Sequence, residues 1–379
     1  MKQKTIGIVG GGQLGRMLTD AAHRLGFRVV VLDPIAHSSA GQVADRQIIG
    51  GFKDRKKILE LAKVSDFLTF EIESADNKTL AEIAKKGKPV NPSPKILKII
   101  KDKFQQKVFL RNHGIPVADF ALIKNQEDAI KQGKGGKLFG YPFLLKARFD
   151  AYDGRGNYVV RKRSDIKKAF VKLTKSTLYA EKFVPFQKEL AVVSARDKFN
   201  TIYSFDVVET IHKNNICHIV RSPADIPLKT KLQANKLAKK VLEALGGVGV
   251  FAIEMFLQKD GNILVNEIAP RVHNSGHHTI EAYSASQFEQ QIRAITGLPL
   301  AKPKTKSKAA VMINILGNRK GKAKFKGGEK AKSISGVNIH IYGKMETRKE
   351  RKMGHVTVLG KTVKEAEKKA LKAKKLISI

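Results

Sequence analysis

A predicted β-hairpin around residue 260 constrains the fold of this chain more than any other segment. Residues 251–257 alternate as in a strand, the Asp-Gly pair at 260–261 has the chemistry of a two-residue type I′ turn, and residues 263–268 form a returning strand. A turn of this length places Glu254 directly opposite Glu267, with both carboxylates on one face. Like charges in this arrangement repel each other, whereas a divalent cation between them would be bound by both. We therefore predict a Mg²⁺ site here; the alternative is two solvated acids on an exposed face.

The segment from Asn266 to His278 is dense in polar and charged side chains. It contains a carboxylate, a guanidinium, amides and several imidazoles within thirteen residues. Such a density is difficult to explain as packing, because every buried polar group needs a partner. The segment is therefore a candidate binding site at the end of a strand.

The N-terminal residues predict a right-handed βαβ unit. A buried strand at 5–10 leads into a glycine-rich turn at 10–15, a helix at about 16–25 and a second buried strand at 28–33. The Gly-x-Gly-x-x-Gly turn, with Asp33 about twenty residues on, is typical of nicotinamide cofactor binding. A glycine turn at the start of a helix can also bind any phosphate or polar anion. Both interpretations are open at this point.

The next two segments along the chain are a strand that ends in acids and a linker. A strand at 66–73 ends in acids, and Glu73 there is either a ligand for a substrate hydroxyl or amine, or a solvated strand end. The segment at 87–94 is rich in turn formers and predicts a linker, after which a helix is expected at about 95–113.

A lysine inside an apolar strand marks a small α/β unit at about 121–179. Lys146 lies in a predicted strand at 141–148, where an unpaired ammonium group would be costly, so we expect it to contact an anion. In the loop at 149–157 that follows, glycines can approach phosphate closely and an arginine can neutralise it. A strand at 178–184 then ends at a proline before the next strand begins.

The sequence changes character from about residue 309. Strands are expected at 311–316 and 337–342, and a helix at 363–376, which together predict a compact β-rich cap. The cations at 348–355 stand beside a glycine and suggest a phosphate clamp, although a solvated basic turn has the same composition.

Size, charge and cysteine content exclude several classes of protein. A chain of 379 residues is expected to form two or three domains, and no apolar run approaches the length of a membrane span. Met1 leads straight into a strand rather than a signal peptide, and the single cysteine, Cys217, excludes an intramolecular disulfide, so a cytoplasmic location fits best. The net charge of +38 raises the possibility of nucleic-acid binding. We expect a lysine-rich solvated surface instead, because the lysines are spread over every segment and no nucleic-acid-binding motif is present.

The order of these segments resembles the ATP-grasp superfamily. Within it, four motifs are similar to the N5-carboxyaminoimidazole ribonucleotide synthetases: residues 152–156 (Tyr-Asp-Gly-Arg-Gly), 266–276 (Asn-Glu-Ile-Ala-Pro-Arg-Val-His-Asn-Ser-Gly), 287–289 (Gln-Phe-Glu) and 351–355 (Arg-Lys-Met-Gly-His). The resemblance implies an α/β fold, α+β in its later parts. It predicts a Rossmann-like pre-ATP-grasp domain at 1–103, an ATP-grasp domain at 104–300 with a lid at about 120–180, and a C-terminal β-rich domain at 301–379.

The resemblance also implies an activity. A synthetase of this family uses ATP to phosphorylate bicarbonate and transfers the carboxyl group to the exocyclic amine of 5-aminoimidazole ribonucleotide, in purine biosynthesis. It implies a cytoplasmic homodimer whose product passes to a separate mutase, with no membrane and no specific nucleic acid as partner.

Site residues can be transferred motif by motif. The resemblance implies that Glu254 and Glu267 bind Mg²⁺, with Mn²⁺ possible, and that Asp153, Arg271, His273 and Asn274 act in catalysis, the last three by holding bicarbonate. The residues implied for ATP binding are Lys103, Lys146, Ala151, Tyr152, Asp153, Gly154, Arg155, Gly156, Asn157, Glu181, Lys182, Phe183, Val184, Glu189, His212, Asn266 and Glu267. Those implied for the aminoimidazole nucleotide are Gln13, Leu14, Glu73, Tyr152, Asp153, Arg348, Arg351 and Lys352, the three cations taking its phosphate.

The sequence departs from the family pattern in two places. Asp150 and Ala151 stand where the family usually has two glycines, which predicts a stiffer lid, and Lys103 stands where arginine is common. The alternatives are another ATP-grasp carboxylase or transformylase, a nicotinamide oxidoreductase built on the glycine turn, and a nucleic-acid-binding protein.

Overall fold

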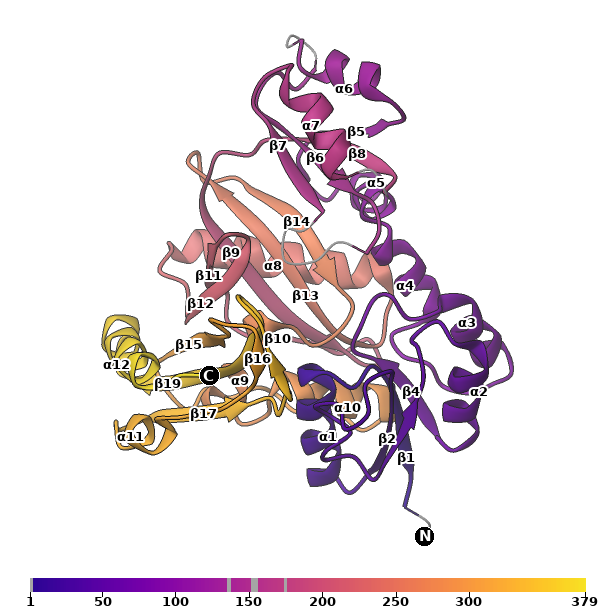
Figure 1. Ribbon diagram of the computed structural model, residues 1–379, viewed down its shortest axis with the longest axis vertical. Coiled ribbons are helices and arrows are strands. Elements are labelled where there is room, and N and C mark those ends of the chain that lie inside the picture. Colours follow the sequence, from indigo (N-terminus) through magenta and orange to yellow (C-terminus); the bar gives the residue numbers. More distant parts are fainter. Residues whose placement is uncertain (1–2, 135–137, 151–155, 174–175) are drawn as a thin grey trace.

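The computed structural model describes residues 3–134, 138–150, 156–173 and 176–379, and begins with a parallel sheet (Figure 1). Four strands lie in the order β3-β2-β1-β4, all parallel, which confirms the predicted βαβ unit. The strands and helices of this part are β1 (Thr5–Val9), α1 (Gln13–Arg24), β2 (Arg28–Asp33), β3 (Arg46–Ile49), α2 (Arg55–Lys63), β4 (Phe67–Phe70) and α3 (Asn77–Lys85). β1 and β2 are nearly continuous buried runs because helices cover both faces of the sheet.

The expected helix at 95–113 is two helices. α4 (Pro94–Lys101) and α5 (Lys103–Asn112) are separated by Asp102, whose backbone is extended. The Asp102 carboxylate accepts hydrogen bonds from the backbone N–H groups of Phe104 (3.1 Å) and Gln105 (3.3 Å), which caps α5. The cap restarts the helix in a new direction, and the prediction of one continuous helix was wrong.

A small antiparallel sheet lies at one end of the molecule, at the top of Figure 1. Its strand order is β5-β8-β6-β7, and its core joins Phe143 and Leu145 to Ile166. Its elements are β5 (Phe120–Ile123), α6 (Gln126–Gln132), β6 (Phe143–Ala147), β7 (Asn157–Val160), α7 (Asp165–Lys172) and β8 (Leu178–Lys182).

A nine-stranded sheet forms the largest layer. Its order is β14-β13-β9-β11-β12-β15-β19-β17, with β10 also paired to β9. The strands are β9 (Phe186–Arg196), β10 (Ile202–Ser204), β11 (Val208–Lys213), β12 (Ile216–Ser222), β13 (Gly249–Gln258), β14 (Ile263–Ala269), β15 (Ala309–Leu316), β17 (Val337–Ile341) and β19 (Lys352–Gly360). The strands expected to form a C-terminal cap therefore extend the same sheet, because β15 pairs with β12.

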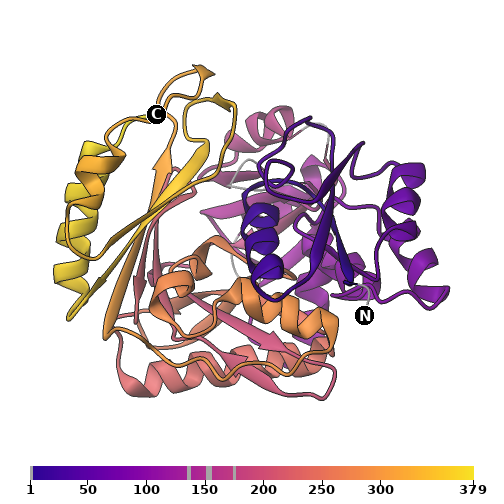
Figure 2. The ribbon, with the colours of Figure 1, turned by 90° about the horizontal axis from the view of Figure 1, so that it is seen from below.

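The remaining helices pack around this sheet, and β16 and β18 form a separate two-stranded sheet (Figures 1 and 2). These elements are α8 (Leu228–Leu245), the 3₁₀ turn η1 (Asn274–Gly276), α9 (Thr279–Ala282), α10 (Gln287–Thr296), β16 (Gly321–Lys322), α11 (Gly328–Lys332), β18 (Glu346–Thr347) and α12 (Val363–Leu376). Among the described ranges, none of the helices combines the length and the apolar character that crossing a membrane requires.

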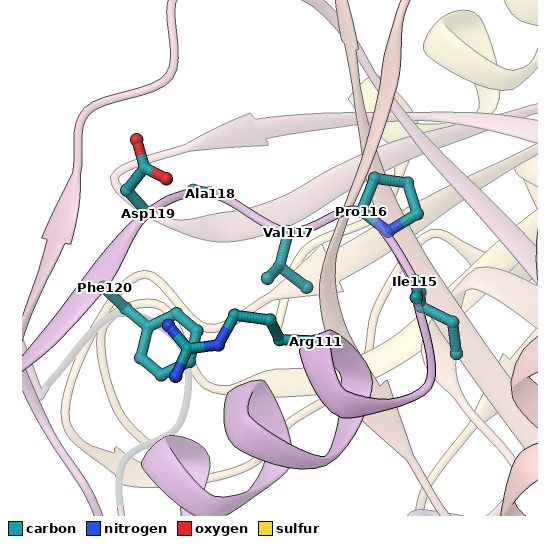
Figure 3. Close-up of a pocket in the computed structure, with 8 residues that line it drawn as sticks. Arg111, Ile115, Pro116, Val117, Ala118, Asp119 and Phe120 are labelled. Atoms are coloured by element: carbon teal, nitrogen blue, oxygen red, sulfur yellow. The ribbon is translucent and has the colours of Figure 1, made fainter.

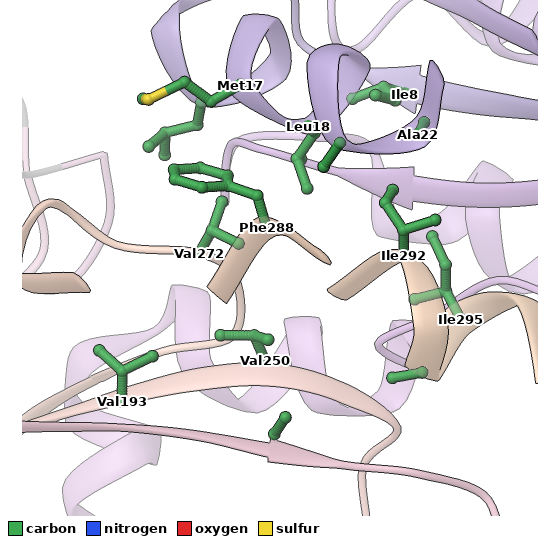
Figure 4. Close-up of a cluster of buried hydrophobic side chains, with 14 of the residues drawn as sticks. Ile8, Met17, Leu18, Ala22, Val193, Val250, Val272, Phe288, Ile292 and Ile295 are labelled. Atoms are coloured by element: carbon green, nitrogen blue, oxygen red, sulfur yellow. The ribbon is translucent and has the colours of Figure 1, made fainter. Parts of the chain in front are cut away.

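A shared core fixes the N-terminal sheet against the large sheet. Phe288 and Ile292 of α10 pack against Met17 and Leu18 of α1 (Figure 4). Burying one such side chain fully contributes about 1.5–3 kcal/mol. The ends of α1, α10 and the hairpin therefore keep fixed positions relative to one another.

Candidate active site

The hairpin places Glu254 opposite Glu267, as predicted, but its turn and strand register differ from the predicted ones. β13 and β14 pair Leu257 with Ile263 and Met255 with Val265, which leaves Asn266 as an extra residue before the Glu254–Glu267 pair. The tip is longer than the two-residue turn we predicted: the backbone N–H of Gln258 donates to the carbonyl of Asn262 (2.9 Å), and Gly261 has a φ of +84°. The β-bulge at Asn266 compensates for the longer tip and restores the expected pair.

The two carboxylates differ in their surroundings. Burial and the charge of Glu267 raise the pKa of Glu254 to about 6. Burial also acts to raise the pKa of Glu267, but Lys103, whose Nζ lies 2.8 Å from Glu267 Oε2, outweighs it and holds that pKa below its usual range. Lys103 therefore compensates the charge of Glu267 but not that of Glu254, and a further cation would relieve the repulsion between the two carboxylates.

Asn266 precedes Glu267 in the bulge and carries a further oxygen. Its Oδ1 is buried and has no hydrogen-bond partner among the described residues, and the bulge frees Asn266 from the regular alternation of the strand. No cluster of three or more His, Cys, Asp or Glu side chains in the described ranges could hold a metal by itself. Two carboxylates and an amide oxygen fit a hard cation that takes its other ligands from a bound phosphate compound.

A buried carboxylate joins two lysines beside the hairpin. Glu181 Oε1 lies 2.9 Å from Lys146 Nζ, and Glu181 Oε2 lies 2.8 Å from Lys107 Nζ. Burial would raise the pKa of Glu181, but the two ammonium groups lower it to about 2. The group has two positive charges and one negative charge, so its excess charge suits an anionic ligand.

Further predicted residues lie on β9, on β11 and at the end of β8. His212 Nδ1 lies 2.5 Å from Glu189 Oε2, and the pKa of His212 is raised because this carboxylate outweighs the effect of burial. Lys182 is exposed and lies 3.4 Å from Asp119, Phe183 is exposed, and Val184 is buried. Lys182 and Phe183 are therefore exposed while Val184 is buried, and a ligand common to all three would have to contact the backbone of this segment.

The predicted lid is only partly described. The Gly156 carbonyl accepts a hydrogen bond from the Ala147 N–H (2.7 Å), and Asn157 begins β7. Ala151, Tyr152, Asp153, Gly154 and Arg155 lie outside the described residues. Their roles stay predictions.

The residues after β14 meet the acids of the N-terminal sheet. Arg271 Nη2 lies 2.8 Å from Glu73 Oε1, and this carboxylate raises the pKa of Arg271 although burial acts against it. His273 Nδ1 accepts a hydrogen bond from the Ser275 N–H (3.3 Å), so its proton resides on Nε2, which lies 3.4 Å from Glu254 Oε1. Burial and then Arg271 lower the pKa of His273 well below its usual value, so the ring is neutral.

Asn274 is held by a buried amide pair. Its Nδ2 donates to Asn314 Oδ1 (3.0 Å), and Asn314 Nδ2 donates back to Asn274 Oδ1 (2.7 Å) and to the Cys217 carbonyl (2.9 Å). One N–H and one lone pair of the Asn274 amide are left for other partners. A contact to a bound anion is therefore restricted to that single N–H.

The glycine turn is filled by the protein itself. Glu71 accepts hydrogen bonds from the backbone N–H groups of Gly12 and, at 2.6 Å, Gly15, and Asp33 accepts one from Gly11 (2.9 Å). A Cβ at Gly12 would lie 2.7 Å from Glu71 Oε1. A nicotinamide dinucleotide would need these N–H groups for its pyrophosphate, so the turn does not offer the open anion site of that interpretation.

Two predicted ligands lie at the start of α1, directly after this turn. Gln13 is its first residue and is half-buried. The Leu14 side chain is part of the core, so only its backbone could touch a substrate.

Glu71 gives a testable pH dependence of stability. Burial, with a smaller contribution from Asp33, raises its pKa from 4.5 to about 7. The folded state therefore holds a proton that the unfolded chain releases, and the stability that Glu71 contributes is present below pH 4.5 and lost as the pH rises to about 7. We expect the free energy of unfolding of the wild type, relative to Glu71→Gln, to fall across this range in urea titrations. A difference that is independent of pH would contradict this prediction.

Lys352, at the end of the basic turn at 348–352, lies near the same site. Arg351 Nη1 donates to the Glu346 carbonyl (2.6 Å), and burial and then Arg348 lower the pKa of Arg351. Lys352 is close enough to His273 to contribute to the lowering of the pKa of that imidazole. The structure therefore brings Lys352 near the segment after β14.

A pocket elsewhere in the molecule is unrelated to these residues. It has a volume of about 330 Å³ at the junction of α5 and β5, where the Arg111 guanidinium lies 4.4 Å from the centre of the Phe120 ring (Figure 3). It is lined by Arg111 and residues 114–120, none of them a predicted site residue.

Sequence reasoning missed four polar residues of the site. Lys107 could have been found, because it lies four positions after Lys103 on the same face of α5. Glu71 and Asn314 act through contacts to residues 56 to 59 and 40 positions away in the chain, for which the sequence has no local signal. Gln287 binds His273, 14 positions away, and was given no role although it lies in the Gln-Phe-Glu motif at 287–289.

Comparison with known proteins accounts for nearly the whole chain. Residues 3–101 match the ribonucleotide synthetase preATP-grasp domain, residues 108–288 the ATP-grasp domain, and residues 310–369 the phosphoribosylaminoimidazole carboxylase C-terminal domain. Phosphoribosylaminoimidazole carboxylase of Ogataea methanolica is 43% identical over 376 residues, which are 97% of this chain and 69% of the relative. The chain spans about two thirds of the length of the fungal relatives it matches.

Solved structures agree with this assignment. N5-carboxyaminoimidazole ribonucleotide synthetase from Thermotoga maritima is 46% identical, with a TM-score of 0.89 and 99% of each chain covered. N5-carboxyaminoimidazole synthase from Aspergillus clavatus, solved with ADP and 5-aminoimidazole ribonucleotide, is 37% identical, with a TM-score of 0.89 and 98% of each chain covered. The chain belongs to the N5-carboxyaminoimidazole ribonucleotide synthetases, a family of ATP-grasp ligases.

Proposed function

We propose that this chain uses ATP and bicarbonate to carboxylate 5-aminoimidazole ribonucleotide, giving N5-carboxyaminoimidazole ribonucleotide, ADP and phosphate. One observation supports this proposal most strongly. The segment from Glu267 to Asn274 joins a carboxylate pair suited to a nucleotide-bound cation to a neutral imidazole and an arginine suited to a small anion. A relative with the same fold was solved with ADP and this nucleotide.

The nucleotide end of the site consists of three lysines and their acids. Lys103, Lys107 and Lys146 each contact a carboxylate, and ATP phosphates would compete for these ammonium groups. We propose that the backbone of Glu181 to Val184 binds adenine and that Glu189, beside His212, binds the ribose hydroxyls. Charge stabilisation by the lysines, rather than covalent catalysis, would favour phosphoryl transfer.

Glu254, Glu267 and Asn266 would hold Mg²⁺, or Mn²⁺, at this end. When bound, the cation would neutralise charge on the transferring and leaving phosphates. These residues hold their positions without the cation, because the bulge at Asn266 fixes Glu254 opposite Glu267.

The carboxyl donor would bind next to this pair. Arg271 supplies positive charge, and the His273 Nε2–H and the remaining Asn274 N–H supply neutral donors, so bicarbonate would be held without a proton transfer from His273. An oxygen of bicarbonate attacks the γ-phosphorus and ADP leaves. The substrate amine then attacks the carboxyl carbon, phosphate leaves with the bridging oxygen, and Asp153 is our candidate to accept the amine proton or orient the amine.

The acceptor nucleotide would bind between the glycine turn and the basic turn. Gln13, the Leu14 backbone and Glu73 lie on the first side, and Arg348, Arg351 and Lys352 would take the 5′-phosphate on the other. Tyr152 and Asp153, on the lid, complete this proposed site. Closure of the lid would exclude water from carboxyphosphate.

We also propose a cytoplasmic homodimer that passes its product to a separate mutase. The homodimer and the mutase are what the resemblance to the family implies, and the single cysteine supports the reducing compartment. No specific nucleic-acid partner is expected.

The proposal is tested by measuring phosphate release from ATP with bicarbonate and 5-aminoimidazole ribonucleotide each present or omitted. We expect coupled formation of the carboxylated product only when both are present. Turnover that ignores the aminoimidazole nucleotide would contradict the proposed acceptor.

A further inference from the structure

Gln287 makes an unusual set of contacts to the predicted bicarbonate segment. It is the first residue of α10 and is fully buried. Its Oε1 accepts a hydrogen bond from the His273 N–H (2.8 Å), and its Nε2 donates to the His273 carbonyl (2.7 Å) and to His277 Nδ1 (3.2 Å). A backbone N–H can only donate and a carbonyl can only accept, so the orientation of the amide is fixed.

These contacts replace a missing strand partner. β14 ends at Ala269, and His273 lies between this strand and η1, outside any sheet. The Gln287 amide binds both backbone groups of this one residue, as a neighbouring strand would. The backbone of His273 sets the direction of its imidazole toward Glu254 and the place of Asn274, which follows it.

Gln287 itself is held rigidly. Its backbone N–H donates to Thr279 Oγ1 (3.0 Å), and Phe288 anchors α10 in the core shared with α1. Gly276 leaves room for its amide, since a Cβ there would lie 2.5 Å from Gln287 Oε1. The segment from Arg271 to Asn274 is thereby tied to a helix rather than to a loop.

We propose that Gln287 is a positioning residue that holds His273 and Asn274 in the geometry that binds bicarbonate. This inference rests on the function proposed above and adds a residue that touches neither substrate nor metal. Without the Nε2 donor, the His273 carbonyl loses its partner in α10, and the segment can shift. A displacement of about 1 Å in a reacting group can cost on the order of 100-fold in rate.

The test compares Gln287→Glu with a matched variant of the same helix. Gln287→Glu preserves size and the acceptor but replaces the donor with an oxygen that faces the His273 carbonyl. Gln290 is also fully buried and binds both backbone groups of one residue, Ala301, by the same pair of contacts. Gln290→Glu therefore reproduces the loss of a backbone-binding donor away from the site.

We expect Gln287→Glu to raise the KM for bicarbonate by about tenfold or more and to change the KM for ATP by less than about twofold. Gln290→Glu should lower the melting temperature by about as much as Gln287→Glu does, but it should change neither the KM for bicarbonate nor the KM for ATP. If Gln287→Glu does not fold, Gly276→Ala, whose methyl group displaces the Gln287 amide, should raise the same KM.

The outcomes separate this inference from the proposed function. The positioning role would be overturned if Gln287→Glu and Gln290→Glu had equal KM values for bicarbonate. It would also be overturned if Gly276→Ala had the same KM for bicarbonate as the wild type. Wild-type turnover that does not depend on bicarbonate would instead overturn the proposed function.

Discussion

Replacing Glu254 with Gln should abolish ATP-dependent turnover while leaving the fold at least as stable as the wild type. Glu254 lies directly opposite Glu267, and burial together with that charge raises its pKa to about 6. Removing one of two facing carboxylates relieves repulsion in the free protein but removes a proposed metal ligand. We expect kcat to fall on the order of 1000-fold. The measurements are steady-state kinetics and thermal denaturation.

Asp260→Asn is the control for this variant. Asp260 is an exposed acid at the tip of the same hairpin, and the hydrogen bonds of its carboxylate come only from Asn262 among the described residues. It should retain wild-type kcat. If Glu254→Gln preserves more than about a tenth of the wild-type activity, or unfolds at a clearly lower temperature, the facing-carboxylate account is wrong.

Glu181→Gln is the second variant with a large expected effect, this time on stability. The Glu181 carboxylate compensates Lys107 and Lys146, and both Glu181 and Lys107 are 2% exposed. Removing this charge leaves two buried ammonium groups side by side, which costs about 3–5 kcal/mol. We expect this loss in the free energy of unfolding by urea denaturation at neutral pH.

Two comparisons identify the cause of that loss. Glu209 also joins two cations, Lys188 and Arg221, but these are 22% and 29% exposed, so Glu209→Gln should cost much less. Adding Lys107→Met to Glu181→Gln should restore part of the stability, because only one ammonium group is then unpaired. A double variant as unstable as Glu181→Gln would show that charge compensation is not the reason.

The sequence predicted correctly that Glu254 faces Glu267, although the predicted turn between their strands was wrong. The tip has more residues than a type I′ turn, but the bulge at Asn266 returns Glu254 to its place opposite Glu267. A pattern of alternating side chains does not distinguish these two registers.

Contacts between distant segments could not be predicted. Glu71 occupies the glycine turn because the parallel pairing of β1 and β4 places it there, and a local fingerprint alone predicts a dinucleotide site. The break at Asp102 has a local cause, the cap on α5, and its ion pair with Arg148 is a distant contact that the sequence does not show. In the same way, the C-terminal strands were recognised as strands, but only the pairing of β12 with β15 shows that they extend the large sheet.

The central claim is that ATP phosphorylates bicarbonate before the amine is carboxylated. The most direct test uses bicarbonate labelled with ¹⁸O, together with ATP and 5-aminoimidazole ribonucleotide, and measures the isotope in the released phosphate by mass spectrometry. The bridging oxygen of carboxyphosphate comes from bicarbonate, so we predict one ¹⁸O atom in each phosphate released. Phosphate free of ¹⁸O, formed together with the carboxylated product, would contradict the account.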